Sequence, residues 1–144
     1  MKDNNLIILF PDSGSFKWGM KLIDKLNYEG EVVVASKSRK YEDGKSKLLQ
    51  QIDRQDFNRK DILIIDDICV YGGTFKGLAK MLRERNCGKL YLAVSHMTVE
   101  NLGEDPVTDY FDMVYTTNSK FEFYDKPAKY HGDRLDNLEI IKLF

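Results

Sequence analysis

Short apolar runs, separated by polar and turn-forming stretches, set the layout of this chain. Leu6 to Phe10 is an unbroken apolar run that ends at a Pro-Asp-Ser-Gly turn, and Val32 to Ala35 and Ile62 to Ile65 are runs of the same kind. Runs of this length, bounded by turn residues, are typical of strands buried on both faces. Further strands are expected at residues 90–94, 113–116 and 138–143.

Helical spacing follows two of these runs. The segment Ser15–Leu26 is predicted to be a helix capped by Ser13 or Ser15, and its aromatic residues, Trp18 among them, are expected in the core or an interface. A second helix, opening at residues 72–74, places four apolar residues on one face: Phe75, Leu78, Ala79 and Leu82. Alternating buried strands and helices predict an α/β fold, a single three-layer domain over residues 1–144 with a mainly parallel sheet flanked by helices.

The segment Lys37–Lys45 interrupts this alternation. It is strongly charged and has no apolar periodicity, which predicts a long mobile loop. Taken alone, such a segment is most simply a solvated surface loop. It gains a functional interpretation only from the two corners described next.

Composition narrows the class of protein. The chain has 144 residues, of which 42% are hydrophobic and 31% charged, as expected of an ordinary globular domain. The formal net charge of −1 argues against a nucleic-acid or membrane binder. The two cysteines and two histidines form no zinc-binding pattern. The first apolar run is too short for a signal peptide or a membrane span, so a cytoplasmic location is expected.

The corner between the strand at residues 62–65 and the second helix carries the strongest chemistry. Asp66 and Asp67 end the strand, and Gly72, Gly73 and Thr74 open the helix. Glycines let a backbone approach a ligand closely, and free amides at a helix start bind anions. Two carboxylates beside a phosphate repel it unless they bind ribose hydroxyls or share a Mg²⁺ ion with the ligand. The alternative is structural: acids that end a strand and glycines that shape a turn.

These residues resemble the signature of type I phosphoribosyltransferases that binds phosphoribosyl pyrophosphate (PRPP): a hydrophobic strand, two acids, a few variable residues and a Gly-Thr end. The resemblance implies a type I phosphoribosyltransferase-like fold. It also implies that the two acids hold the ribose hydroxyls while the loop and helix start hold the 5′-phosphate. The residues implied to bind ribose or PRPP are Asp66, Asp67, Tyr71, Gly72, Gly73 and Thr74.

Three further motifs are similar, in the same order, to the C-terminal half of ribose-phosphate pyrophosphokinases (PRPP synthetases). Pro11–Gly14 resembles their pyrophosphate loop, and Lys37-Ser38-Arg39 resembles the Lys-x-Arg of their flexible catalytic loop. Leu92–His96 resembles the strand after their second helix. The similarity runs in register from Phe10 to Asn118.

This second resemblance implies a reaction and its residues. The reaction moves a diphosphoryl group from ATP to ribose 5-phosphate, and Lys37 and Arg39 are implied to be the catalytic cations that stabilise the developing negative charge. The implied pyrophosphate-binding residues are Asp12, Ser13 and Gly14, and the implied Mg²⁺ ligands are Asp12, Asp66 and Asp67.

The sequence departs from the pyrophosphokinase pattern in three places. Nothing in it corresponds to the N-terminal domain that supplies much of the ATP site. Val70-Tyr71 replaces small or hydroxyl residues, and Ser15 stands where a second glycine is common. Phe121–Tyr124 together with Tyr130-His131 fits either a hood over a base or an edge hairpin.

Three functions therefore stay open. The favoured one is a PRPP-synthetase-like transferase whose ATP site is completed by a partner or neighbouring subunit. The alternatives are a phosphoribosyltransferase that joins PRPP to a nitrogen base with release of pyrophosphate, and a non-catalytic subunit that senses PRPP. Small molecules (PRPP, ribose 5-phosphate, ATP or a base) are the expected partners, together with Mg²⁺. Relatives of this kind generally assemble, so a homo-oligomer is expected.

Overall fold

The computed structural model describes residues 5–98, 104–120 and 136–143. Six parallel strands form one sheet in the order β2-β1-β5-β6-β7-β8. The strands are β1 (Leu6–Phe10), β2 (Glu31–Val34), β5 (Asp61–Cys69), β6 (Leu90–Met97), β7 (Met113–Thr117) and β8 (Leu138–Ile141). The helices are α1 (Ser13–Lys25), α2 (Gly73–Glu84) and the 3₁₀ turn η2 (Val107–Tyr110). The predicted α/β class with a mainly parallel sheet is confirmed.

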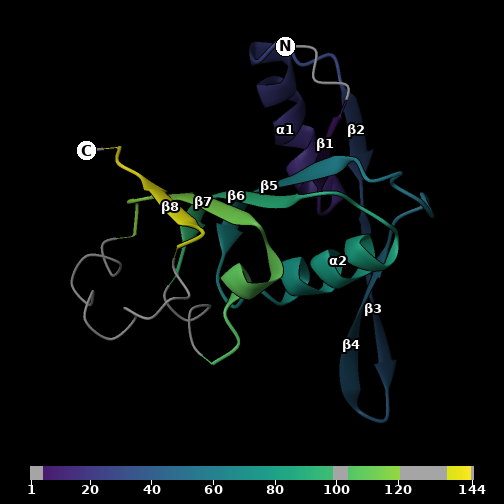
Figure 1. Cartoon of the computed structure of the whole chain (residues 1–144). Coiled ribbons are helices and arrows are strands. Elements are labelled where there is room, and N and C mark those ends of the chain that lie inside the picture. The colour runs from purple at the N-terminus through teal and green to yellow at the C-terminus, as the bar shows by residue number, and fades with distance from the viewer. Residues whose placement is uncertain (1–4, 99–103, 121–135, 144) are drawn as a thin grey trace.

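The helices cover opposite faces of the sheet, so the predicted three layers are present (Figure 1). Strand β1 shows why its run is apolar throughout. Ile7 and Leu9 pack in the core on the α2 side, whereas Ile8 and Phe10 pack in the core on the α1 side. The predicted apolar face of α2 is buried at all four positions: Phe75, Leu78, Ala79 and Leu82. Burying each large apolar side chain contributes about 1.5–3 kcal/mol, which fixes both helices on the sheet.

The start of α1 corrects one prediction. The N-cap is Asp12, not Ser13 or Ser15. The backbone N–H of Ser15 donates to Asp12 Oδ1 at 2.9 Å, and the backbone N–H of Asp12 donates to Ser15 Oγ at 3.2 Å. This reciprocal pair is a capping box in which a serine replaces the usual Glu or Gln.

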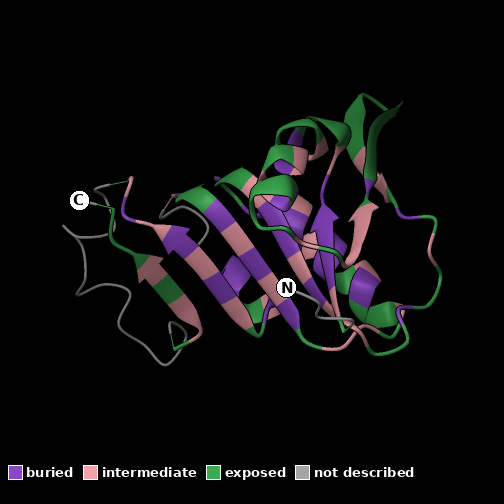
Figure 2. Ribbon diagram, turned by 90° about the horizontal axis from the view of Figure 1, so that it is seen from above, coloured by how far each residue is buried: buried purple, intermediate pink, exposed green. Residues whose placement is uncertain are grey.

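The predicted loop at Lys37–Lys45 was wrong. These residues belong to an antiparallel hairpin of β3 (Ser36–Glu42) and β4 (Lys45–Gln51). Asp43 and Gly44 turn it with φ of 50° and 71°, the left-handed backbone that two-residue hairpin turns require. The hairpin projects away from the sheet beyond α2, and most of it is exposed (Figures 1 and 2). Because the strands bury no face, their sequence has no apolar alternation, and the Asp-Gly pair was its one local signal.

Expectations about membrane spans, the segment 121–131 and the extent of the domain can be set against the described residues only in part. No helix within the described ranges is long and apolar enough to cross a membrane. The segment 121–131, expected to be a hood or an edge hairpin, lies outside those ranges. The extent of the domain over residues 1–144 stays a prediction.

Candidate functional site

The carboxyl ends of β1 and β5 open into a cleft of about 870 Å³. Ligands of open parallel sheets bind at this edge, where strand–helix loops diverge. The cleft is lined by Asp12, Gly14, Ser15, Trp18, Lys37, Arg39, Leu48, Asp66, Asp67, Ile68, Val70, Tyr71, Gly72, Gly73, Thr74 and Phe75. Every residue predicted for the site except Ser13 is in this lining. The structure thus brings together two corners and a hairpin that are far apart in the sequence.

The acidic part of the cleft centres on Asp66. Its Oδ1 accepts a hydrogen bond of 2.9 Å from the backbone N–H of Asp67. The pKa of Asp66 is raised from 3.8 to about 6, chiefly because burial disfavours the charged form, and the nearby carboxylates of Asp67 and Asp12 add to the shift. A cation or a hydrogen-bond donor placed here relieves that repulsion.

The carboxylate oxygens of this acidic part also suit a hard cation. Within the described residues, no three His, Cys, Asp or Glu side chains converge tightly enough to form a ready-made metal site. Mg²⁺, however, is commonly held by one or two carboxylates while waters and phosphate oxygens fill the other positions. Asp66 and Asp67, with Asp12 nearby, fit that shared arrangement.

The start of α2 forms another part of the cleft. Gly72 takes φ 76°, and the site of a Cβ there lies 3.1 Å from Cβ of Val107, so both backbone and space favour glycine. No described side chain caps this helix end. The first-turn N–H groups have no partner within the helix and carry partial positive charge, so they are available to an anion.

The corner after β1 is built differently. There the carboxylate of Asp12 caps α1 and engages the backbone N–H of Ser15. A carboxylate at a helix start occupies the position that an anion would take. The two corners therefore differ: one offers free helix amides, and the other offers a carboxylate next to Gly14 and Asp66.

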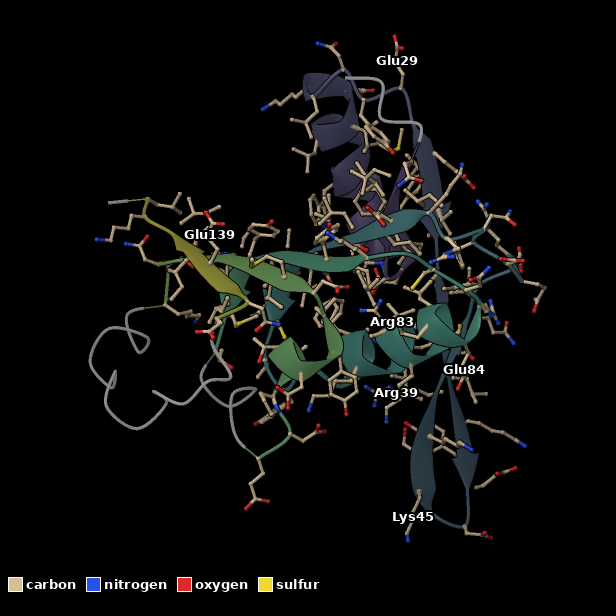
Figure 3. All side chains as sticks on the ribbon, in the orientation of Figure 1. Glu29, Arg39, Lys45, Arg83, Glu84 and Glu139 are labelled. Atoms are coloured by element: carbon tan, nitrogen blue, oxygen red, sulfur yellow. The ribbon has the colours of Figure 1, made fainter. Side chains whose placement is uncertain are left out.

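The hairpin supplies the positive charge. Lys37 and Arg39 alternate with outward residues along β3, and Leu48, the cross-strand partner of Arg39, lines the cleft beside them. Figure 3 shows Arg39 next to α2, whereas Lys45 lies at the tip of the hairpin. The cations thus reach the same cleft as the acidic pair, from the hairpin.

Sequence reasoning missed several lining residues. Trp18, expected in the core or an interface, is 37% exposed, lines the cleft and packs edge-on against Phe10 with ring centroids 6.2 Å apart. Leu48 was missed because the strand that carries it was not predicted. The Asp-Gly pair was the available signal, because a two-residue turn there places Leu48 opposite Arg39.

Comparison with known proteins identifies the family. The sequence model of the phosphoribosyl transferase domain matches residues 1–130, so the chain belongs to that family. A ribose-phosphate pyrophosphokinase from Chlorobaculum tepidum is 26% identical over 136 residues, which cover 94% of this chain and 41% of that protein. Another from Thermoplasma acidophilum is 31% identical over 64 residues, 44% of this chain and 22% of that protein. The chain thus spans less than half the length of these curated relatives.

Solved structures agree on the fold. Phosphoribosylpyrophosphate synthetase from Mycobacterium smegmatis matches with a TM-score of 0.65 at 21% identity, covering 97% of this chain and 41% of that one. Purine phosphoribosyltransferase from Pyrococcus horikoshii matches with a TM-score of 0.56 at 19% identity, covering 72% and 67%. The predicted type I phosphoribosyltransferase-like fold is confirmed.

Proposed function

We propose that this chain binds PRPP, or the ribose 5-phosphate from which PRPP is made, and acts as a PRPP-synthetase-like transferase of nucleotide metabolism. One observation carries the proposal: a single cleft holds the acidic pair Asp66 and Asp67, the uncapped start of α2, and the cations Lys37 and Arg39. PRPP has a matching set of groups, namely two ribose hydroxyls, a 5′-phosphate and a pyrophosphate.

Each part of the cleft suits one part of the ligand. Asp66 and Asp67 accept hydrogen bonds from the ribose hydroxyls, which stabilise the charged carboxylate that burial and, to a lesser extent, the neighbouring acids disfavour. The first-turn amides of α2 and the hydroxyl of Thr74 receive the 5′-phosphate. The pyrophosphate extends toward Asp12 and Gly14 and lies under Lys37 and Arg39, where the planar Arg39 side chain grips two oxygens at once.

Mg²⁺ completes the proposed site. Asp66 and Asp67, with Asp12, would hold it together with oxygens of the ligand. When bound, the ion would offset the charge of the pyrophosphate next to three carboxylates. The catalytic work of the chain itself is positional and electrostatic: it orients the sugar phosphate and places two cations where negative charge grows during diphosphoryl transfer.

The identity of the relatives favours diphosphoryl transfer over base transfer. The curated relatives that cover most of this chain are ribose-phosphate pyrophosphokinases, in C. tepidum and in Mycoplasmopsis pulmonis. Because the chain spans about two-fifths of their length, we propose that a partner or neighbouring subunit completes the ATP site.

Two parallel assays test the reaction. Formation of AMP from ATP and ribose 5-phosphate is measured with Mg²⁺, and release of pyrophosphate is measured with PRPP and a panel of nitrogen bases. The Lys37→Ala variant should lower the rate of AMP formation about a hundredfold, since it removes a charge that acts in the transition state. Lys40→Ala is the matched control, because Lys40 points from the other face of β3 and pairs with Glu42.

The outcomes separate the candidates. AMP formation that is lost in Lys37→Ala and kept in Lys40→Ala supports the synthetase-like function. Pyrophosphate release with one particular base, and no AMP, favours the phosphoribosyltransferase. Neither reaction, from a chain that binds PRPP with an affinity that Lys37→Ala leaves nearly unchanged, favours the sensing subunit.

A further inference from the structure

We propose that Gln50 is a positioning residue: its side-chain amide anchors the β3–β4 hairpin on the first turn of α2 and so holds Lys37 and Arg39 at the cleft. The inference rests on the proposed function, because the two cations matter only if the cleft receives a pyrophosphate. It concerns a residue that contributes no atom to the cleft lining.

The register of the hairpin places Gln50 on the cleft side. Lys37 pairs with Gln50, and Arg39 pairs with Leu48. Cross-strand partners project from the same face of an antiparallel pair. Gln50 therefore lies on the face that carries both cations and Leu48, next to the lysine it must hold in place.

The amide then reaches the phosphate-binding turn. Gln50 Nε2 donates a hydrogen bond of 2.9 Å to the backbone carbonyl of Thr74. Thr74 belongs to the first turn of α2, whose residues line the cleft. One hydrogen bond thus joins the strand partner of Lys37 to the helix turn assigned to the 5′-phosphate.

Gly77 leaves space on the surface of α2 for the side chain of Gln50. A Cβ at Gly77 would collide with Oε1 of Gln50. Glycine in the middle of a helix costs about 1 kcal/mol relative to alanine. The absence of a side chain at this position is explained by the amide that packs there.

Little else holds the hairpin against the domain. All seven residues of β3 are exposed, and on β4 only Leu48, Leu49 and Gln50 are half-buried, so apolar burial contributes little to the orientation of the hairpin. Its two ends are held by hydrogen bonds to backbone carbonyls: the backbone N–H of Ala35 donates to Phe10 at 2.9 Å, and the side-chain guanidinium of Arg85 donates to Ile52 and Arg54. These contacts fix where the hairpin leaves the domain, whereas Gln50 fixes which way its basic face points.

Hydrogen–deuterium exchange of the full chain tests the anchor without any ligand. Gln50→Met keeps the length of the side chain but has no donor, and Gly77→Ala displaces the amide while improving the helix. Both should speed exchange of the β3 and β4 amides about three- to tenfold, the effect of losing one hydrogen bond. Gln51→Ala, at the exposed neighbouring position on the other face, should exchange like the wild type.

Ligand affinity separates positioning from general damage to the cleft. In Gln50→Met, affinity for PRPP should fall about fivefold, whereas affinity for ribose 5-phosphate, which has no pyrophosphate, should not change. Unchanged exchange in both variants, or an equal loss for both ligands, would overturn the proposal. If the wild type binds neither ligand, the proposed function fails, and the exchange data alone support or overturn the anchor.

Discussion

Asp66 lies in the C-terminal half of β5, partly buried and close to two other carboxylates, so its charge is costly in the folded protein. Its pKa is about 6 there, above the ordinary value of 3.8. An acid whose pKa rises on folding stabilises the fold fully only below its unfolded pKa. As the pH rises from about 4 to about 6, the free energy of unfolding should therefore decrease. The decrease should be about 1 kcal/mol once solvent screening is allowed for.

Asp66→Asn should remove this pH dependence and raise the free energy of unfolding at pH 7 by about 1 kcal/mol. Urea denaturation at pH 4.5 and pH 7 measures both. Asp53→Asn makes the same chemical change at an exposed position and should keep the slope of the wild type. A loss of stability in Asp66→Asn at pH 7 would show that its carboxylate is held by favourable contacts instead.

Gly72 allows a second test on single residues. Gly72→Ala places a side chain on a left-handed backbone and against Val107, so it should lower the free energy of unfolding by about 2 kcal/mol. Gly44→Ala shares the left-handed backbone but has open space around it, and should cost about 1 kcal/mol or less. Equal losses in the two variants, measured by urea denaturation, would mean that Val107 does not crowd Gly72.

At the scale of elements, Gly19 holds α1 close to β1. A Cβ at Gly19 would collide with the ring of Phe10. That ring is fully buried and packs edge-on against both Phe16 and Trp18. Gly19→Ala should therefore destabilise the fold by about 1–3 kcal/mol, although alanine is the better helix former.

Gly77→Ala is the matched control, because it meets only the movable end of Gln50 and should leave the midpoint of thermal unfolding unchanged or higher. If Gly19→Ala raises that midpoint as well, the packing described between α1 and β1 is incorrect.

The elements differ in how well their sequence predicts them. Strand β5 was predictable because its apolar run is continuous and bounded by polar residues, and helix α2 because its apolar positions repeat with the helical period and face a core. The β3–β4 hairpin was not, because it buries neither face and depends on contacts from distant residues such as Thr74 and Arg85. The cap of α1 was misassigned because Asp12 and Ser15 cap it reciprocally, and either side chain satisfies the local pattern.

For the whole molecule, the acidic pair and the helix start of the candidate site were more predictable from the sequence than its basic side. Asp66 and Asp67 were expected to end their strand, but β5 continues to Cys69 and they lie inside its C-terminal part. Thr74 follows in the first turn of α2, so the convergence of the three residues is still a property of the local sequence. The approach of Lys37 and Arg39 to them depends on the fold of the hairpin, and sequence similarity alone suggested it. A homo-oligomer, the Mg²⁺ ion and the specific reaction stay predictions.

The central claim is that the cleft binds PRPP through Asp66 and Asp67, and calorimetric titration of PRPP in the presence of Mg²⁺ tests it most directly. We predict a Kd on the order of 1 μM, about −8 kcal/mol, for the wild type and for the exposed control Asp53→Asn. Binding should be lost in the double variant Asp66→Asn/Asp67→Asn, which keeps the shape of both side chains. No binding by the wild type, or undiminished binding by the double variant, would contradict the account.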